Sequence, residues 1–325
     1  MKGEAGLCLL CGSGEFVPAF YSSDRLYGTT DRQFAVVRCG GCGLMRLEPR
    51  PSENELRDYY PAAYWFAPNG QAAGRFEQAY RRLVLRDHVR FVEGALDRAR
   101  ASGNGERWQV PLLDVGCGGG LFLRLMRERG FRAVGLDFSA DAARMAWRLE
   151  GAPVVCGTLD HAPLNAATFG CITMFHVLEH LADPRVFLIE ARRLLAEGGR
   201  LVVQVPNAAS WQARVLGARW NGMDVPRHLF DFRVNDLEKL LESCGFRVAR
   251  RKHFSLRDNP AGLASSVAPG LDPMARRVRK RSESGAGRVA TDLAYLALVA
   301  AALPFTLAEA ACRAGSTIMV EASKA

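Results

Sequence analysis

The run LLDVGCGGG at residues 112–120 constrains the fold more than any other part of the chain. It begins as a short apolar strand and ends in four glycines among its last five residues. Glycines there let the backbone approach a ligand closely, because no Cβ intervenes. In α/β sheets, ligands bind beyond the carboxyl ends of the strands. The spacing is G-x-G-x-G with Leu121 next, which differs from the G-x-G-x-x-G of dinucleotide enzymes.

After this run, predicted strands alternate with predicted helices. The strand candidates are RAVGLDF, PVVCG, GCITMF, RLVVQVP, FRVARRKHF and, near the C-terminus, STIMVEA. The segment VNDLEKLLESCGF has a helical pattern, with Asn235 and Glu238 as an expected capping pair and Gly245 as the expected end. Alternation of this kind predicts an α/β sheet, mainly parallel, with helices on both faces.

Two carboxylates follow the next two strands. Asp137 ends RAVGLDF, and Asp160 lies in CGTLDHAPL after the third strand. An acidic residue at the end of the second strand can accept hydrogen bonds from both hydroxyls of a ribose. In this order and spacing, the glycine run, Asp137 and Asp160 resemble the class I S-adenosylmethionine (SAM) dependent methyltransferases. The resemblance covers roughly residues 108–255 and the final strand.

This resemblance implies a Rossmann-like seven-stranded sheet whose last strand runs antiparallel, and SAM as the cofactor. It implies that residues 114–120 hold the methionine end of SAM, that Asp137 binds the ribose, and that Asp160 with its neighbour binds the adenine. The first residue after the fourth strand faces the methyl donor in this family. The implied cofactor-binding residues are Asp114, Gly116, Gly118, Gly120, Asp137, Leu159, Asp160 and His176.

The segment FHVLEHL at 175–181 contains an H-x-x-E-H pattern, which also occurs in zinc peptidases of the inverted type. A peptidase needs both histidines within one helix and a further ligand. Here the segment starts as the turn after a strand, which disfavours that interpretation. Similar family members, among them quinone-pathway O-methyltransferases, carry V-L-E-H here, and the likeness implies that His176, Glu179 and His180 could hold a divalent metal. The alternative is that Glu179 and His180 tie the turn to neighbouring strands.

The long connection at 206–232 is expected to serve the methyl acceptor, because long loops at the site face are often functional. Its side chains could shape a pocket or pack as a lid, and they are Trp211, Trp220, His228 and Phe230. Methyl transfer mainly requires alignment of the nucleophile with the methyl group. An alcohol acceptor must also lose its proton, which suits a histidine. We therefore expect His228 as the catalytic base, with His176 as the second candidate.

Four cysteines near the N-terminus form two C-x2-C pairs, each followed by glycine: Cys8, Cys11, Cys39 and Cys42. Four thiolates at this spacing predict a tetrahedral structural zinc site without an open position. The alternatives are a redox pair or free cysteines. We expect a zinc-ribbon-like segment at 1–50, a linker and helical lead-in at 51–107, and the methyltransferase core at 108–256 plus 314–325.

The cysteine pairs and the motif P-R-P-S-x-x-E-L-x-x-Y-Y resemble two bacterial groups. One comprises sugar C-methyltransferases of deoxysugar biosynthesis, and the other comprises shorter enzymes encoded near cell-surface polysaccharide genes. The first group normally carries a further large C-terminal domain, which this sequence does not contain. We therefore expect O-methylation of a sugar, glycan or related hydroxylated small molecule, with C-methylation of a nucleotide sugar as the alternative.

Residues 257–313 are predicted to form a helical insertion before the last strand. The insertion contains ARRVRKRS and then LAYLALVAAALPFTLAEAA. The apolar run before Pro304 is about half of the ~20 residues that span a bilayer. A crossing would also disconnect the final strand from its sheet. Two alternatives remain: a helical hairpin packed on the enzyme or on a twin subunit in a homodimer, and a peripheral membrane contact through 276–311.

The net charge of +9 suits an anionic partner, although codon usage explains it equally well. A zinc-ribbon nucleic-acid-binding protein or an RNA methyltransferase is thus the alternative class. It is disfavoured because the basic residues are scattered and no N-P-P-Y or D-P-P-Y motif follows the fourth strand. The N-terminus, MKGEAGLCLLCG, has no apolar core typical of a signal peptide, so we expect a cytoplasmic protein, with membrane contact, if any, on the inner face.

Overall fold

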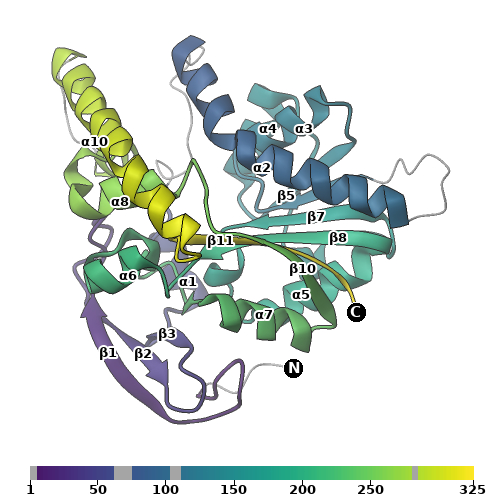
Figure 1. The fold of residues 1–325 in the computed structure, drawn as a ribbon, viewed down its shortest axis with the longest axis horizontal. Coiled ribbons are helices and arrows are strands. Elements are labelled where there is room, and N and C mark those ends of the chain that lie inside the picture. The colour runs from purple at the N-terminus through teal and green to yellow at the C-terminus, as the bar shows by residue number, and fades with distance from the viewer. Residues whose placement is uncertain (1–5, 62–74, 103–110, 280–284) are drawn as a thin grey trace.

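The computed structural model describes residues 6–61, 75–102, 111–279 and 285–325. Within these ranges the chain forms a seven-stranded sheet and a four-stranded sheet (Figure 1). The strand order in the larger sheet is β10-β11-β8-β7-β4-β5-β6. Its strands are β4 (Leu112–Val115), β5 (Ala133–Asp137), β6 (Val154–Cys156), β7 (Phe169–Phe175), β8 (Leu195–Pro206), β10 (Phe246–Lys252) and β11 (Thr317–Lys324).

Four neighbouring pairs in the larger sheet are parallel: β4–β5, β4–β7, β5–β6 and β7–β8. The last strand, β11, is antiparallel to both β8 and β10. Strands such as β7 are nearly continuous apolar runs, because helices cover both faces of the sheet. The sheet predicted from the sequence is therefore confirmed, including its antiparallel last strand.

Helices pack on the two faces of the sheet (Figure 1). One face carries α2 (Arg75–Ser102), α3 (Leu121–Glu128) and α4 (Ala140–Glu150), and the other carries α5 (Pro184–Leu194) and α7 (Val234–Ser243). The apolar side chains of these helices meet the strands in two buried cores, one on each face. The carboxyl ends of the parallel strands thus share one edge, where the sequence predicts the site.

Local sequence signals set most helix ends. Ser139 caps α4 by accepting a hydrogen bond from the backbone of Ala142. The expected capping pair of α7 is wrong, because that helix begins before Asn235. Its cap is Arg233, whose backbone N–H donates to the Asp236 carboxylate at 3.0 Å. Glu238 instead forms an ion pair with the guanidinium of β10 residue Arg251.

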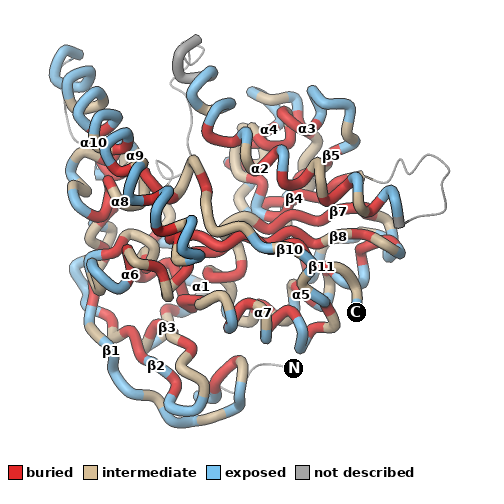
Figure 2. Tube along the Cα trace, in the orientation of Figure 1, coloured by how far each residue is buried: buried red, intermediate tan, exposed pale blue. Residues whose placement is uncertain are grey.

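The smaller sheet joins the N-terminal segment to the core. Its strands are β1 (Phe16–Ser22), β2 (Phe34–Cys39), β3 (Met45–Glu48) and β9 (Phe230–Asp231), and the short helix α1 (Glu53–Asp58) follows. Strand β9 comes from the connection after β8 and pairs with β3. Buried residues of β2 and β3 belong to the same core as those of β8 and α7. Figure 2 shows buried stretches in both strands. The expected boundary near residue 107 lies outside the described residues.

The connection after β8 and the insertion after β10 are helical. They contain α6 (Trp211–Leu216), α8 (Asn259–Val267), α9 (Pro273–Val278) and α10 (Gly285–Ala311). Single 3-10 turns occur at Leu159–His161, Leu178–His180, Gly217–Arg219, Asn221–Met223 and Pro269–Leu271. Helix α10 packs against α8 and extends away from the sheet (Figure 1), and most of its surface is exposed (Figure 2).

Candidate functional site

The turn between β4 and α3 requires glycine at three positions. Gly116, Gly118 and Gly120 have left-handed φ angles of 72°, 52° and 79°. A Cβ on Gly116 would lie 2.7 Å from the Val177 side chain, and one on Gly120 would lie 2.7 Å from the Ala146 Cβ. At Gly118 no heavy atom lies within 4 Å of that position. The turn is therefore closely packed at both ends and open in the middle, where a ligand can approach the backbone.

Asp137 at the end of β5 holds this turn in place. Its two carboxylate oxygens accept the backbone N–H of Gly118 at 2.8 Å and that of Ser139 at 2.9 Å. The side chain is buried, and burial raises its pKa. Each carboxylate oxygen keeps a further lone pair after these contacts. The residue can thus orient the turn and still accept hydrogen bonds from a ligand.

Two more predicted cofactor positions flank the turn. Asp114 is buried on β4 and accepts a hydrogen bond from the Thr173 hydroxyl at 2.6 Å. Burial, with the charge of Asp137, raises the pKa of Asp114 to about 7. Leu159 is fully buried after β6, and the Asp160 carboxylate beside it lies 3.1 Å from His161 Nδ1. All these residues lie at the carboxyl ends of three adjacent parallel strands.

His176 follows β7 in a left-handed conformation, with φ 56°. Its Nδ1 lies 3.0 Å from Glu179 Oε1, and its Nε2 lies 3.5 Å from Asp258 Oδ2. Burial alone would lower the pKa of this imidazole, but the two carboxylates outweigh burial and raise it to about 9. A pKa of about 9 favours the protonated ring at neutral pH, and a protonated ring donates hydrogen bonds rather than accepting a proton.

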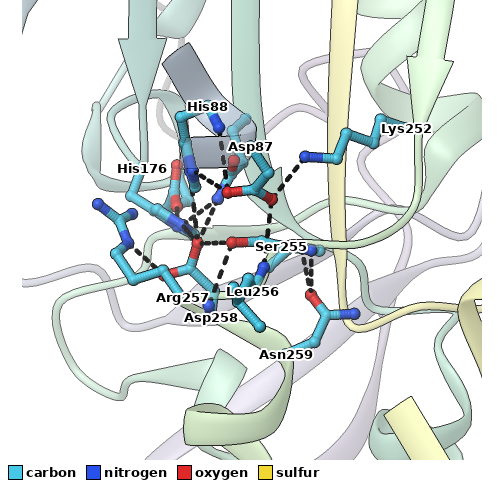
Figure 3. A network of polar contacts seen from close by, with 12 residues as sticks. Asp87, His88, His176, Lys252, Ser255, Leu256, Arg257, Asp258 and Asn259 are labelled. Atoms are coloured by element: carbon cyan, nitrogen blue, oxygen red, sulfur yellow. Dashed lines mark hydrogen bonds and ion pairs between the residues drawn. The ribbon is translucent and has the colours of Figure 1, made fainter. Parts of the chain in front are cut away.

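Asp258 is the centre of a polar network around His176 (Figure 3). One of its oxygens accepts the Gln204 amide and the Ser255 hydroxyl, each at 2.6 Å, and the other accepts Arg257 Nε at 2.7 Å. Burial raises the pKa of Asp258, but Arg257 and His176 outweigh it and hold the pKa well below its usual range. The network joins β7, β8 and the start of α8.

Helix α2 adds two residues to this network (Figure 3). Asp87 contacts His88 Nδ1 at 3.0 Å and accepts Lys252 Nζ at 2.6 Å. Burial raises the Asp87 pKa, but these two partners outweigh it and hold the pKa at about 2. His88 is fully buried, packs edge-on against Phe175 and reaches within 3.7 Å of Asp258.

Sequence reasoning missed the residues of this network other than His176. One signal was available: His88 lies in the buried stripe of α2, one turn from Leu85 and Val92. A polar side chain at helical spacing within an apolar stripe indicates a buried polar contact. The positions of Gln204 and Asp258 relative to His176 carry no local signal, because they depend on the packing of separate elements.

Glu179 lies between three histidines. Its carboxylate contacts His176, and its remaining oxygen is buried without a hydrogen-bond partner among the described residues. One ligand atom each from Glu179, His180 and His228 lies within 4.8 Å of the others. The structure thus brings both predicted catalytic histidines, His176 and His228, to the same glutamate.

Backbone carbonyls lie beside one nitrogen of two of these histidines. His180 Nδ1 lies 3.1 Å from the Arg227 carbonyl and 2.9 Å from the Tyr60 hydroxyl, and His228 Nδ1 lies 2.9 Å from the Gly222 carbonyl. Because a carbonyl only accepts, these contacts favour a hydrogen on each Nδ1 and a lone pair on each Nε2. Burial lowers the pKa of His180 to about 4. One carboxylate and two imidazoles form a donor set that suits a divalent cation.

Comparison with known proteins identifies the chain. A family model described as a methyltransferase domain matches residues 76–250, which is more than half of the 325 residues. The chain belongs to this methyltransferase family. It is a SAM-dependent methyltransferase, because the family model is a methyltransferase domain and a relative is named as a probable SAM-dependent methyltransferase.

Two relatives illustrate the similarity. A ubiquinone biosynthesis O-methyltransferase of Erwinia tasmaniensis is 29% identical over 174 residues, which cover 50% of this chain and 70% of the relative. A probable SAM-dependent methyltransferase of Mycolicibacterium smegmatis is 32% identical over 204 residues, which cover 62% and 66%. The crystal structure of the cyclase SpnF covers 85% of this chain and 97% of its own, with 21% identity and a TM-score of 0.51, which shows likeness of fold alone.

In this methyltransferase, a buried arginine positions the loop that carries His228. The Arg227 side chain is fully buried and contacts Asp24 at 2.9 Å and Asp224 at 2.7 Å. Its guanidinium also lies over the Tyr27 ring, 4.5 Å from the centroid. The N-terminal segment and the connection after β8 are thus held together by one ion-pair network. Both carboxylate oxygens of Asp224 accept hydrogen bonds from Arg227.

The aromatic residues of the connection mainly pack. Trp220 and Phe230 are buried in the core, and Trp211 lies against Phe305 of α10, with ring centroids 6.1 Å apart. A small cleft that is open to solvent lies between the N-terminal segment and the connection. Trp220 and Asp224 line this cleft. The sequence left open whether these aromatics shape a pocket or pack as a lid. Trp220 and Phe230 pack.

The four predicted zinc ligands of the methyltransferase lie together. Cys8 and Cys42 have sulfurs 3.4 Å apart, and those of Cys11 and Cys39 are 3.5 Å apart. All four sulfurs lie within 4.8 Å of one another. Zinc–sulfur bonds of about 2.3 Å in a tetrahedron place the sulfurs roughly 3.8 Å apart, so the residues fit a zinc ion. The Gly43 N–H donates to the Cys39 carbonyl at 2.9 Å, which closes one of the two tight turns.

Proposed function

We propose that this methyltransferase O-methylates a hydroxylated small molecule, with a sugar or glycan hydroxyl as the acceptor. The observation that carries this proposal is the cluster of His176, Glu179, His180 and His228 beside the glycine turn. The cluster and the turn are adjacent, because Val177 packs against Gly116. A histidine whose Nε2 has a free lone pair, placed next to a carboxylate, suits the removal of a proton from a hydroxyl group. The relatives named as O-methyltransferases support transfer to oxygen over transfer to carbon.

The residues around the glycine turn fit SAM. Gly116, Gly118 and Gly120 leave the backbone accessible for the methionine end, with Asp114 behind them. Asp137 has the lone pairs to accept the ribose hydroxyls. Leu159 would pack on the adenine, with Asp160 as acceptor for its amino group. When bound, SAM supplies an electrophilic methyl group on a positively charged sulfur.

His228 is the favoured base. Its Nδ1 hydrogen is committed to the Gly222 carbonyl, which leaves Nε2 to accept a proton. His176 is held in its protonated form by Asp258 and Glu179, so its role is to orient and to donate a hydrogen bond. In this assignment the Glu179 charge stabilises the imidazolium that forms on His228.

The same cluster favours a second mechanism. A divalent cation held by Glu179, His180 and His228 would satisfy the partnerless Glu179 oxygen and would lower the pKa of an acceptor hydroxyl directly. Chelation separates the two mechanisms. Activity that survives a chelator, with the cysteine-bound zinc retained, supports His228 as the base, whereas activity that returns only with added cation supports the metal.

We also propose that Cys8, Cys11, Cys39 and Cys42 hold a structural zinc. Their mutual distances and the glycine turns support this assignment. Metal analysis of the purified protein should give about one equivalent of zinc. The variant Cys11→Ser, at the exposed ligand, should lose most of it and melt at a lower temperature. Less than about half an equivalent in the unmodified protein would reject the site.

The acceptor is tested with methyl-labelled SAM and separate pools of nucleotide sugars, lipid-linked glycans, quinone-pathway phenols and RNA. We expect label in a hydroxyl-bearing pool, as an O-methyl ether by NMR. His228→Asn should reduce the turnover by roughly 100-fold or more while SAM still binds. His253→Asn, outside the cluster, is the matched control and should retain activity. Label in RNA, or a C-methyl product, would contradict O-methylation of a small molecule.

A further inference from the structure

Helix α10 has aliphatic side chains on its outer face and both polar and apolar side chains where it packs. Its buried stripe consists of Tyr295, Val299, Ala302, Thr306 and Glu309. The Tyr295 hydroxyl lies 3.0 Å from the Ser265 hydroxyl, and Glu309 accepts the Gln212 amide at 2.7 Å. A surface helix of a water-soluble protein normally carries charged and polar side chains on its outer face. The sequence of α10 is therefore suited to an outer surface that meets something other than water.

The outer face of α10 carries exposed aliphatic side chains at helical spacing: Val289, Leu293, Leu296 and Leu307, which are 59%, 61%, 44% and 53% exposed. Between Leu293 and Ala308 no residue is charged. Three of these four aliphatic residues lie within this charge-free stretch, and most of α10 is exposed (Figure 2). Exposed contiguous apolar surface of this kind marks a site of interaction.

Helix α6 lies beside the C-terminal end of α10 (Figure 1). Phe305 of α10 is partly exposed and lies against Trp211 of α6. Val215, one turn further along α6, is 77% exposed. We call the α10 stripe together with Phe305 and Val215 the apolar helix face.

A strongly basic segment precedes this face directly. Residues 276–288 read RRVRKRSESGAGR, with six arginines or lysines and one glutamate. Arg276 is used internally, because it pairs with Asp292. Arg279 donates to two backbone carbonyls, which leave its charge unneutralised. Arg288 is exposed in the first turn of α10, with its Nε 3.9 Å from Asp292. Lys280 and Arg281 lie outside the described residues. Apolar side chains flanked by clustered basic residues are the combination that interfacial helices present to anionic lipid.

The two ends of α10 decide between crossing a membrane and lying on it. By length and composition the helix could cross, and 22% of its most apolar window is buried. However, Asp292 near its start pairs with Arg276 of α9, and Glu309 near its end contacts Gln212 and Ser316. The following strand, β11, lies inside the sheet between β8 and β10. A crossing would put these two anchored ends on opposite sides of the bilayer.

We infer that the protein docks peripherally on an anionic lipid bilayer, with the apolar helix face in the interface and the described basic residues beside it, Arg277, Arg279 and Arg288, on the headgroups. A second copy of the chain fits this face less well, because α10 offers no free carboxylate to balance the arginines of another copy: Asp292 is paired and Glu309 is buried. This inference goes beyond the proposed function and does not depend on the acceptor.

Flotation of the full-length, zinc-containing protein with vesicles tests the inference. One set of vesicles is phosphatidylcholine alone, and the other contains phosphatidylglycerol as well. We expect binding to the anionic vesicles to exceed binding to the neutral ones by about tenfold at low salt and to weaken as salt rises. The double variant Leu293→Glu/Leu296→Glu should bind at least about tenfold more weakly, because it removes apolar burial and adds negative charge. The matched control is Ile189→Glu, an equally exposed aliphatic residue on α5, and it should bind as the unmodified protein does.

Two readouts keep this experiment decisive. Circular dichroism melts and SAM binding of the double variant should match those of the unmodified protein, because both leucines are exposed. If that variant fails to fold, Arg288→Glu replaces it and should lower the preference for anionic vesicles. Failure of the unmodified protein to float with anionic vesicles would overturn the inference. So would a stable dimer that the glutamate variants dissociate and that does not bind vesicles.

Discussion

The cofactor side and the histidine side of this methyltransferase are built in different ways. On the cofactor side, Asp137 holds the turn through Gly118 and Ser139, which are 19 and 2 residues away in the sequence. On the histidine side, Gln204 meets Asp258 across 54 residues, and Arg227 meets Asp24 across 203. The first side is therefore a local motif, whereas the second exists only after the chain has folded.

The two sides also differ in how they are stabilised. The glycine turn is fixed by backbone N–H groups and close packing, which leave its centre open. The histidine side carries buried charges that compensate each other, such as His176 with Asp258 and Arg227 with Asp24. Removing one member of a buried pair leaves the other charge uncompensated, which costs far more than losing a local hydrogen bond. Substitutions on the two sides should thus differ in size.

The largest effect is expected for Arg227→Met. It leaves Asp24 and Asp224 without their shared cation, so the free energy of unfolding should fall by about 3–5 kcal/mol. Urea denaturation measures this fall. Arg219→Met, at an exposed arginine of the same connection, is the control and should change stability by less than about 0.5 kcal/mol. Equal effects of the two substitutions would show that the buried pair does not hold the histidine side together.

A smaller, pH-dependent effect is expected for His176→Gln. The pKa of this histidine rises from 6.5 to about 9 in the folded protein. The stabilisation is therefore fully present below pH 6.5 and is lost as the pH rises through about 9. Relative to the variant, the unmodified protein should be more stable by up to about 3 kcal/mol at the acidic end.

The measurement is urea unfolding of both proteins in a series of buffers spanning this range. The zinc site and the other titratable groups are common to both proteins, so they cancel in the difference. A difference that does not vary with pH would mean that His176 is not held protonated by Asp258 and Glu179.

The smallest effect is expected for Ser139→Ala on the cofactor side. The serine caps α4 through the Ala142 N–H at 3.2 Å, so its loss should cost about 1 kcal/mol. Calorimetric melting measures the cost. Ser243→Ala, whose hydroxyl contacts only the last turn of α7, should cost less and serves as the control. A loss as large as that from Arg227→Met would break the contrast between the two sides.

The contrast between the locally built cofactor side and the histidine side explains which features could be predicted from the sequence. The sheet, the glycine turn and the clustered cysteines follow from short-range patterns, and the structure agrees with each of them. The network at Asp258 does not, because its members come from α2, β7, β8 and the start of α8. The capping of α7 was predicted wrongly for a related reason: Asp236 bonds Arg233, and the Arg233 side chain in turn donates to the Cys42 carbonyl of the distant cysteine cluster.

The role of His228 could be predicted only in part from the sequence. The sequence identified it as a histidine in a long connection, but its partner Glu179 was predicted to act with His176 and His180. The position of His228 depends on Arg227, which is buried between Asp24 and Asp224. An arginine in a loop carries no sequence signal of burial, since arginine is mostly exposed.

The central claim is that the turn at 116–120, held by Asp137, binds SAM. Isothermal titration calorimetry with SAM, for the unmodified protein and Asp137→Asn, tests it most directly, with Asp141→Asn on exposed helix surface as the control. The account predicts binding to the unmodified protein and the control, and binding to Asp137→Asn that is roughly 10–100-fold weaker. Folded protein that binds neither SAM nor its demethylated product, or equal affinity for all three proteins, would contradict it.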